Sequence, residues 1–170
     1  MKKMFLVALM AVLSSTAFAQ LVSSHRYVAS KSHNVWLDLG VGAFTGDYED
    51  GGLGTSLGLR VNKMFTENIG WDIFKIAAQA DTKHFKESIA AKALTGIRVE
   101  SPELFSNGKV YANFDGGYVY AFDAGDGAFT WEVGAGVKFK NRYIVGVAYE
   151  SYSKNSFSVG LINLRLGVAF

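Results

Sequence analysis

Histidine is the commonest general base in enzymes, and the sequence contains three of them: His25, His33 and His84. His84, which is expected in a connection between strands, has Ser88 and either Glu87 or Asp81 close by in the sequence. A serine, a histidine and an acid can form the nucleophile, base and orienting group of an acyl-transfer site. The order and spacing of these residues match no acyl-transfer pattern, and exposed loop residues explain the group equally well. The sequence therefore predicts no catalytic residue.

Two other groups contain residue types that bind ions. Asp47, Glu49 and Asp50 could offer carboxylate oxygens to a hard cation such as Ca²⁺, but a solvated acidic loop also explains them. The glycine-rich run at 51–54 precedes an expected strand, so it lacks the helix N-terminus that cradles a phosphate group. The chain has no cysteine, and its histidines have no metal-ligand spacing. We expect neither a metal nor a cofactor.

The elements that position the polar residues are expected to be β-strands. Apolar and polar residues alternate with period two from His33 onward, and turn-forming residues interrupt the pattern. The 19 glycines disfavour helices, because glycine costs roughly 1 kcal/mol per helix position relative to alanine. Eight strands joined by hairpins can close into an all-β, up-and-down antiparallel barrel without a free edge. We expect these strands at about residues 33–44, 53–65, 69–79, 88–99, 109–122, 128–140, 142–152 and 157–170.

The two faces of the expected strands differ in a way that indicates lipid on one side. In the sixth strand, Phe129 and Phe139 flank Val133 and Ala135, which is the order of an apolar band bounded by aromatic residues. The opposite face is rich in glycine and alanine with scattered charges. A narrow barrel interior needs such small residues, whereas a solvated face would carry more charge. The pattern favours a transmembrane barrel over a soluble one such as a lipocalin.

Ten charged residues would then point into the barrel, five of them acidic and five basic. An isolated charge in a confined interior costs several kcal/mol, so we expect these residues to pair and to form hydrogen bonds. Such a network would brace the barrel and would perform no chemistry. The ten residues are Asp38, Arg60, Asp72, Lys92, Arg98, Asp115, Glu132, Lys138, Glu150 and Arg165.

Lys75 does not fit this pattern. If Trp71 and Ile73 face lipid, strict alternation places Lys75 there as well, where a lysine at the bilayer midplane costs about 2–4 kcal/mol. One explanation is a β-bulge that shifts the register after Ile73. The other is that Lys75 lies high enough for its amine to reach the interface. The sequence does not decide between them.

Residues 1–19 have the pattern of a cleaved signal peptide. Two lysines precede an apolar run over residues 4–13, and Ala17-Phe18-Ala19 supplies the small residues that signal peptidase recognises. The apolar run is shorter than the roughly 20 residues that a transmembrane helix needs. The sequence therefore predicts export of the chain.

The mature chain is expected to have a polar tail over residues 20–32 and a barrel over residues 33–170. Removing Lys2 and Lys3 lowers the sum of Lys and Arg from 17 to 15, against 15 Asp and Glu. The mature chain is then formally neutral. No basic surface of the kind that binds nucleic acid is expected.

The sequence resembles the small eight-stranded outer-membrane barrels, which are OmpA-, OmpX- or OmpW-like and are often called porin-family proteins. The features that carry the resemblance are the signal peptide, the eight strands and the closing run Leu164-Arg165-Leu166-Gly167-Val168-Ala169-Phe170. The resemblance implies a monomer in the bacterial outer membrane, surrounded by outer-membrane lipids. It also implies that Phe170 and its alternating neighbours form the signal that the barrel-assembly machinery reads.

Three functions are compatible with this resemblance. The leading one is a structural role in membrane integrity, for an integral barrel with a largely filled polar lumen. The second is a channel for small solutes or hydrophobic compounds, although side chains largely fill an eight-stranded barrel. The third is an enzyme that modifies lipid A, for which the group around His84 is the only candidate. We expect that the protein is not an enzyme.

Overall fold

A computed structural model describes residues 33–46, 53–66, 68–81, 89–104, 108–122, 125–140, 142–154 and 157–170. The expected signal peptide and polar tail lie outside these residues, as do the acidic group at 47–50 and the segment that contains His84. In the described part, no helix is long and apolar enough to cross a membrane.

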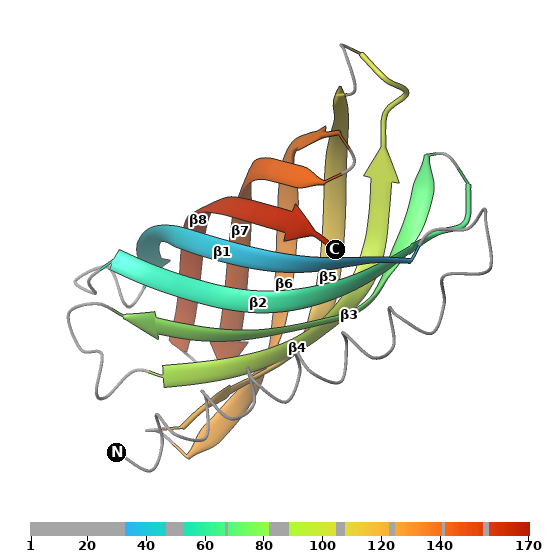
Figure 1. Ribbon diagram of the computed structural model, residues 1–170. Helices are drawn as coiled ribbons and strands as arrows, with labels where there is room; N and C mark the ends of the chain where they lie inside the picture. Colours follow the sequence, from blue (N-terminus) through green and yellow to red (C-terminus); the bar gives the residue numbers. More distant parts are fainter. Residues whose placement is uncertain are drawn as a thin grey trace. The chain divides into compact units, whose positions relative to one another are not determined.

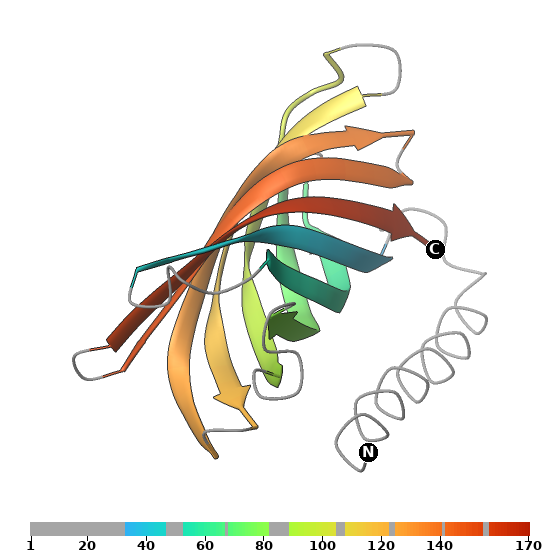
Figure 2. The same ribbon diagram turned by 90° about the vertical axis from the view of Figure 1, so that its left-hand side faces the viewer.

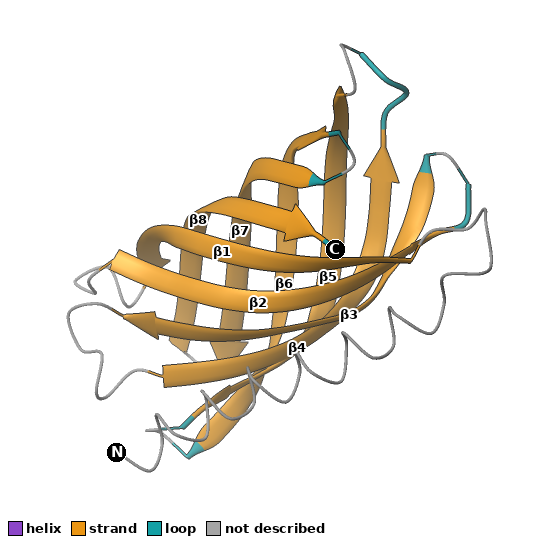
Figure 3. Cartoon of the chain, in the orientation of Figure 1, coloured by secondary structure: helices purple, strands orange, loops and turns teal. Residues whose placement is uncertain are grey.

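The described residues form eight strands, which agree with the predicted segments to within two residues at each end (Figures 1 and 3). Segments rich in alternating apolar residues are extended because each can then present one apolar and one polar face. The strands are β1 (His33–Gly46), β2 (Leu53–Met64), β3 (Ile69–Asp81), β4 (Ile89–Glu100), β5 (Gly108–Ala121), β6 (Asp126–Phe139), β7 (Tyr143–Lys154) and β8 (Phe157–Ala169).

The strands close into a barrel in which each strand pairs with the next and β8 pairs with β1. The first and last strands lie side by side in Figure 2, in a register that runs from Trp36↔Ala169 to Gly46↔Val159. The prediction of a closed, antiparallel, eight-stranded barrel is confirmed. We call the end where β1 begins and β8 ends the terminal end, and the other end the loop end.

Side chains alternate between the inside and the outside of the barrel. In β6, Thr130, Glu132 and Lys138 are buried, whereas Phe129 and Val133 are exposed. The outer surface is consequently apolar: Val147 is 58% exposed, and Leu164 is 53% exposed. A soluble monomer rarely exposes a continuous apolar surface of this extent.

Apolar side chains also occupy both ends of the interior. At the terminal end, Trp36, Tyr111, Ile144 and Ala169 form a buried cluster. Tyr111 fits there because the wall beside it has no side chain, since a Cβ at Gly146 would lie 2.6 Å from the Tyr111 hydroxyl oxygen. At the loop end, a second cluster is formed by Phe44, Val159 and Leu161, with Tyr152 packed against it.

A β-bulge in β3 explains the position of Lys75. On the β2 side, Val61 pairs with Phe74 and Asn62 pairs with Asp72, which leaves Ile73 as an extra residue. The register between β3 and β4 shifts at the same place. Lys75 consequently points inward and is only 3% exposed. Of the two explanations that the sequence allowed, the bulge is the one that the structure contains.

Candidate functional site

The interior of the barrel is a layered arrangement of charged side chains between the two apolar clusters. All ten of the charged residues predicted to face inward are buried. Three more charged residues are buried with them: Lys75, Asp81 and Glu100. Together, the buried charges of the described residues are seven acidic and six basic groups, so their signs nearly balance.

Arg60 on β2 is the centre of one layer. Its Nη2 atom lies 2.8 Å from Asp38 Oδ2, and its Nη1 atom lies 3.5 Å from Asp72 Oδ2. The amide of Asn62 donates a hydrogen bond of 2.8 Å to the other oxygen of Asp72. One guanidinium group therefore links the carboxylates of β1 and β3 across β2, which lies between them.

Glu132 on β6 holds two cations in the next layer. Its Oε1 atom lies 2.7 Å from Arg165 Nη2, and its Oε2 atom pairs with the amine of Lys75. Asn113, on the neighbouring strand β5, donates a hydrogen bond of 2.6 Å to Asp115. β3 lies three places from β6 in the ring, so the pair of Glu132 with Lys75 crosses the lumen, whereas its pair with Arg165 on β8 spans β7.

Another pair also crosses the lumen. The amine of Lys92 on β4 pairs with Glu150 on β7, and Gln79 Oε1 lies 3.4 Å from the same amine. Lys92 and Glu150 are both almost completely buried. The pair joins two more strands that are not neighbours in the sheet.

The charged layer at the terminal end is centred on Glu100. Its two oxygens accept from Arg98 Nε, at 3.0 Å, and from the amine of Lys138. The guanidinium carbon of Arg98 lies 4.1 Å from the ring centroid of Tyr111 and 5.7 Å from that of Trp36. This cation–π contact compensates the two Nη atoms of Arg98, which have no hydrogen-bond partner among the described protein atoms.

Most of the buried charged residues of the interior are paired with one another, and this pairing indicates a structural role for them. Nine of the ten predicted residues take part in ion pairs, and Asp115 accepts from Asn113. The described residues include no group of His, Cys, Asp and Glu side chains that could hold a metal ion. Paired, buried charges of this kind fix the positions of the strands relative to one another.

The sequence also singled out the group around His84 and the last residue, Phe170. Of the group around His84, only Asp81 is among the described residues, where it ends β3 and is buried. Phe170 follows β8, its amide donates to the carbonyl of Val35 at 2.9 Å, and its side chain is 67% exposed on the outer surface. Phe170 therefore continues the outward apolar face of β8 to the end of the chain.

The sequence reasoning missed Glu100 because the expected fourth strand ended at residue 99, although Glu100 lies on the inward parity of Lys92 and Arg98. Extending that strand by one residue would have found it. Asp81 lies beyond the expected end of the third strand at residue 79, and its inward position also depends on the bulge. Lys75 could not be assigned from periodicity, because a bulge depends on the pairing of β3 with its neighbours.

Comparison with known proteins places the fold among outer-membrane barrels. No protein-family model and no curated protein matches the sequence. Among solved structures, the outer membrane enzyme PagL superposes with a TM-score of 0.63 at 17% identity, covering 78% of this chain and 98% of PagL. Neisserial surface protein A superposes with a TM-score of 0.53 at 13% identity, covering 84% of this chain and 100% of the other.

The attachment invasion locus protein Ail of Yersinia pestis, solved with the heparin analogue sucrose octasulfate, also matches. Its TM-score is 0.51 at 13% identity, and the match covers 84% of this chain and 100% of Ail. At such identities, the likeness concerns the fold alone. The chain has the fold of the small eight-stranded outer-membrane barrels, and proteins with this fold perform different functions.

Proposed function

We propose that the protein is an integral barrel of the bacterial outer membrane with a structural role and a lumen closed by its own side chains. The apolar outer surface supports the membrane location, because large aliphatic side chains cover it on every strand. The fold that it shares with outer-membrane barrels supports the same location.

The distribution of aromatic residues on the outer surface also supports a membrane. Near the terminal end, the exposed aromatic side chains are Phe65, Trp71, Phe139, Tyr143 and Phe170. Near the loop end, they include Tyr118, Tyr120 and Phe129. Aromatic rings of membrane barrels concentrate at the two interfaces, where an apolar ring with a polar edge is most stable.

The single observation that carries the structural role is the set of ion pairs across the lumen. The pairs of Glu132 with Lys75 and of Lys92 with Glu150 each connect strands that lie three places apart in the ring of eight. The apolar clusters of Trp36 and Phe44 lie beyond them toward the two ends. A hydrated ion would have to break these pairs in order to pass, which is expensive in a confined interior.

Conductance in planar lipid bilayers tests this role. The purified barrel is expected to give no steady current above that of the bare bilayer. A double variant, Lys92→Ala with Glu150→Ala, removes one crossing pair with both of its charges and is the variant most expected to leak. A steady current through the unchanged protein, with a selectivity that shifts in this double variant, would instead establish a channel.

An enzyme is the second candidate, because the first of the matching structures described above is an outer membrane enzyme. The candidate residues are His84 and Ser88, with Glu87 or Asp81 as the acid. Expression of the protein in a host with known lipid A would shift the mass of lipid A if this candidate were correct. The shift would disappear in His84→Ala and persist in His25→Ala. An unchanged mass spectrum is the result that we expect.

A further inference from the structure

An open groove of about 350 Å³ lies on the outer surface near the terminal end. Its lining is almost entirely apolar, and its volume is within the range of about 300–1,000 Å³ typical of small-molecule pockets. The residues that line it belong to β3, β4 and the turn before β3: Phe65, Ile69, Gly70, Trp71, Thr95, Gly96 and Ile97.

The β3 bulge determines the shape of the groove. Thr95 lies opposite the bulge, and its hydroxyl donates to the carbonyl of Asp72 at 3.0 Å. The indole nitrogen of Trp71 donates to the same hydroxyl oxygen at 2.7 Å. These two hydrogen bonds fix the indole as one wall of the groove, and the ring of Phe65 packs edge-on against it at 6.4 Å between centroids.

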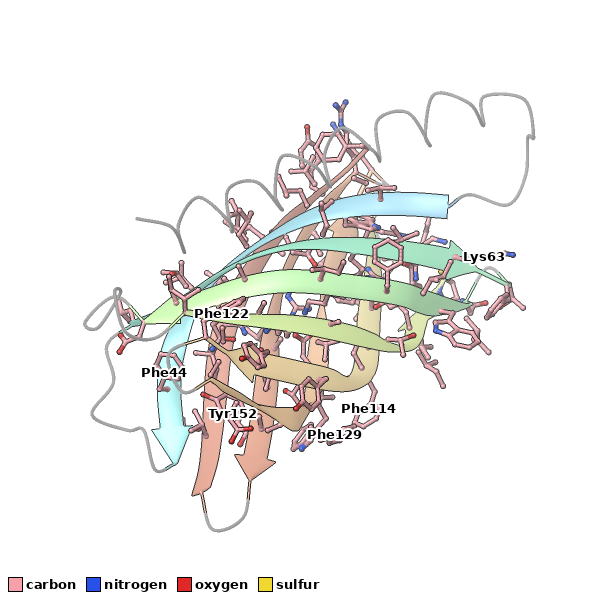
Figure 4. All side chains as sticks on the ribbon, turned by 90° about the horizontal axis from the view of Figure 1, so that it is seen from below. Phe44, Lys63, Phe114, Phe122, Phe129 and Tyr152 are labelled. Carbon is pink, nitrogen blue, oxygen red and sulfur yellow. The ribbon has the colours of Figure 1, made fainter. Side chains whose placement is uncertain are left out.

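A cation lies beside this apolar groove. Lys63 is the direct cross-strand partner of Trp71, and the two side chains share the outer face. Directly opposed residues have Cβ atoms about 4.5–5.5 Å apart. Figure 4 shows Lys63 at the end of the barrel, with its amine directed away from the strands. An apolar groove with a lysine beside it matches a molecule with an alkyl chain and an anionic head.

We propose that this groove binds one phospholipid of the surrounding leaflet, with an acyl chain against Trp71 and Ile97 and the phosphate on the Lys63 amine. The inference rests on the proposed membrane location. The position supports it, because the groove lies near the terminal end, among the exposed aromatic residues that mark an interface. A lysine near an interface extends its amine toward the headgroups while its methylenes remain in contact with apolar atoms.

A second copy of the chain fits the groove less well than a lipid does. An apolar contact between two barrels at this place would fill the groove but would bring no anion to the Lys63 amine, which points away from the strands. A phospholipid supplies both the alkyl chain and the anion that the amine needs.

Tryptophan fluorescence in a phosphate-free detergent such as dodecyl maltoside tests the proposal. The chain has three tryptophans, so Trp36→Phe with Trp131→Phe leaves Trp71 as the only fluorophore. The probes are phosphatidylglycerol and diacylglycerol with the same brominated acyl chains, which quench tryptophan on contact. We expect half-quenching of Trp71 at an about three- to five-fold lower mole fraction of the phosphatidylglycerol, the size expected for one lysine near an anionic headgroup.

Two lysine variants make the test specific. Lys63→Gln is expected to make the two probes quench equally. Lys140→Gln, at an exposed position in the turn after β6 at the same end of the barrel, is the matched control and should leave the difference unchanged. Lys63 lies on the outer face of β2 and Lys140 lies in a turn, so neither variant removes a charge from the barrel interior.

The outcomes separate this proposal from the membrane location. A companion protein with Trp131 alone reports on a different part of the wall. If neither probe quenches Trp131, the membrane location fails. If both quench Trp131 while Trp71 shows no preference, or keeps its preference in Lys63→Gln, the lipid site fails alone. If neither probe quenches Trp71 and the barrels can be cross-linked as dimers, the groove binds a second copy of the chain and the lipid proposal is wrong.

Discussion

At the scale of single residues, Glu132 joins two buried cations from different strands in the lumen. Its carboxylate is fully buried and holds Lys75 on one oxygen and Arg165 on the other. The amide of Asn113 lies 3.4 Å from the same group. Because strands β3, β5, β6 and β8 all reach this side chain, its loss affects half of the barrel.

We expect Glu132→Gln to lower the free energy of unfolding by about 3–5 kcal/mol, because it leaves two buried cations without their partner. Urea titration of the barrel in lipid vesicles, followed by tryptophan fluorescence, measures the change. Adding Lys75→Met to Glu132→Gln should recover part of the loss, since it removes one of the stranded charges. Lys140→Gln, which removes an exposed charge, is the control and should change the free energy of unfolding little. An equally small change for Glu132→Gln would show that the ion pairs do not brace the barrel.

The charged residues of the interior were predictable from the sequence where the strands alternate regularly. Arg60, Glu132 and Arg165 share the parity of small residues on their strands, so each could be assigned to the inside. Their partners could not be assigned, because a pair such as Lys92 with Glu150 joins strands that only the closed barrel brings together. Tyr111 shares the inward parity of Asp115, so its direction was predictable, but the space that Gly146 leaves for its hydroxyl on β7 was not.

At the scale of strands, the proposed membrane location predicts that the apolar outer face tolerates charge poorly. Ala135 lies near the middle of β6, opposite Ala112 and Val147 on its neighbours, and is exposed on the outer surface. We expect Ala135→Arg to prevent assembly, because an arginine at the bilayer midplane costs about 2–4 kcal/mol. The measurement is the amount of folded protein in purified outer membranes.

Ala135→Leu is the matched control for this prediction and should assemble like the unchanged protein. A conservative change on the other face, Lys138→Arg, keeps the charge that pairs with Glu100 and is expected to have a milder effect on assembly than Ala135→Arg. Equal yields from all three variants would contradict the assignment of the inner and outer faces.

The β3 bulge allows a second test at this scale, with two single-residue deletions. Deleting Ile73 removes the extra residue, so Asp72 and Lys75 both still point inward. Deleting Ala78 instead turns Gln79 and Asp81 outward, because one residue shifts the face of every residue after it. We expect the first deletion to assemble and the second to fail, as judged by the yield of folded barrel. The opposite result would contradict the register.

At the scale of the whole molecule, closure gives every strand a partner on both sides. A closed sheet has no edge from which a detergent or another chain can begin to separate the strands. We expect unheated samples in dodecyl sulfate gels to migrate differently from boiled samples. Identical migration before and after boiling, for protein refolded in lipid, would contradict a stable closed barrel.

Closure also has a consequence for how the polypeptide is made. The seam between β1 and β8 joins residues at opposite ends of the folded region, so it cannot form until translation has supplied the last strand. Until then, two unsatisfied edges expose backbone groups that can pair with the wrong molecule. We therefore expect the unfinished barrel to need another protein that covers both unpaired strand edges until β8 pairs with β1. A stop codon that removes β8 would leave these edges exposed and would favour aggregation.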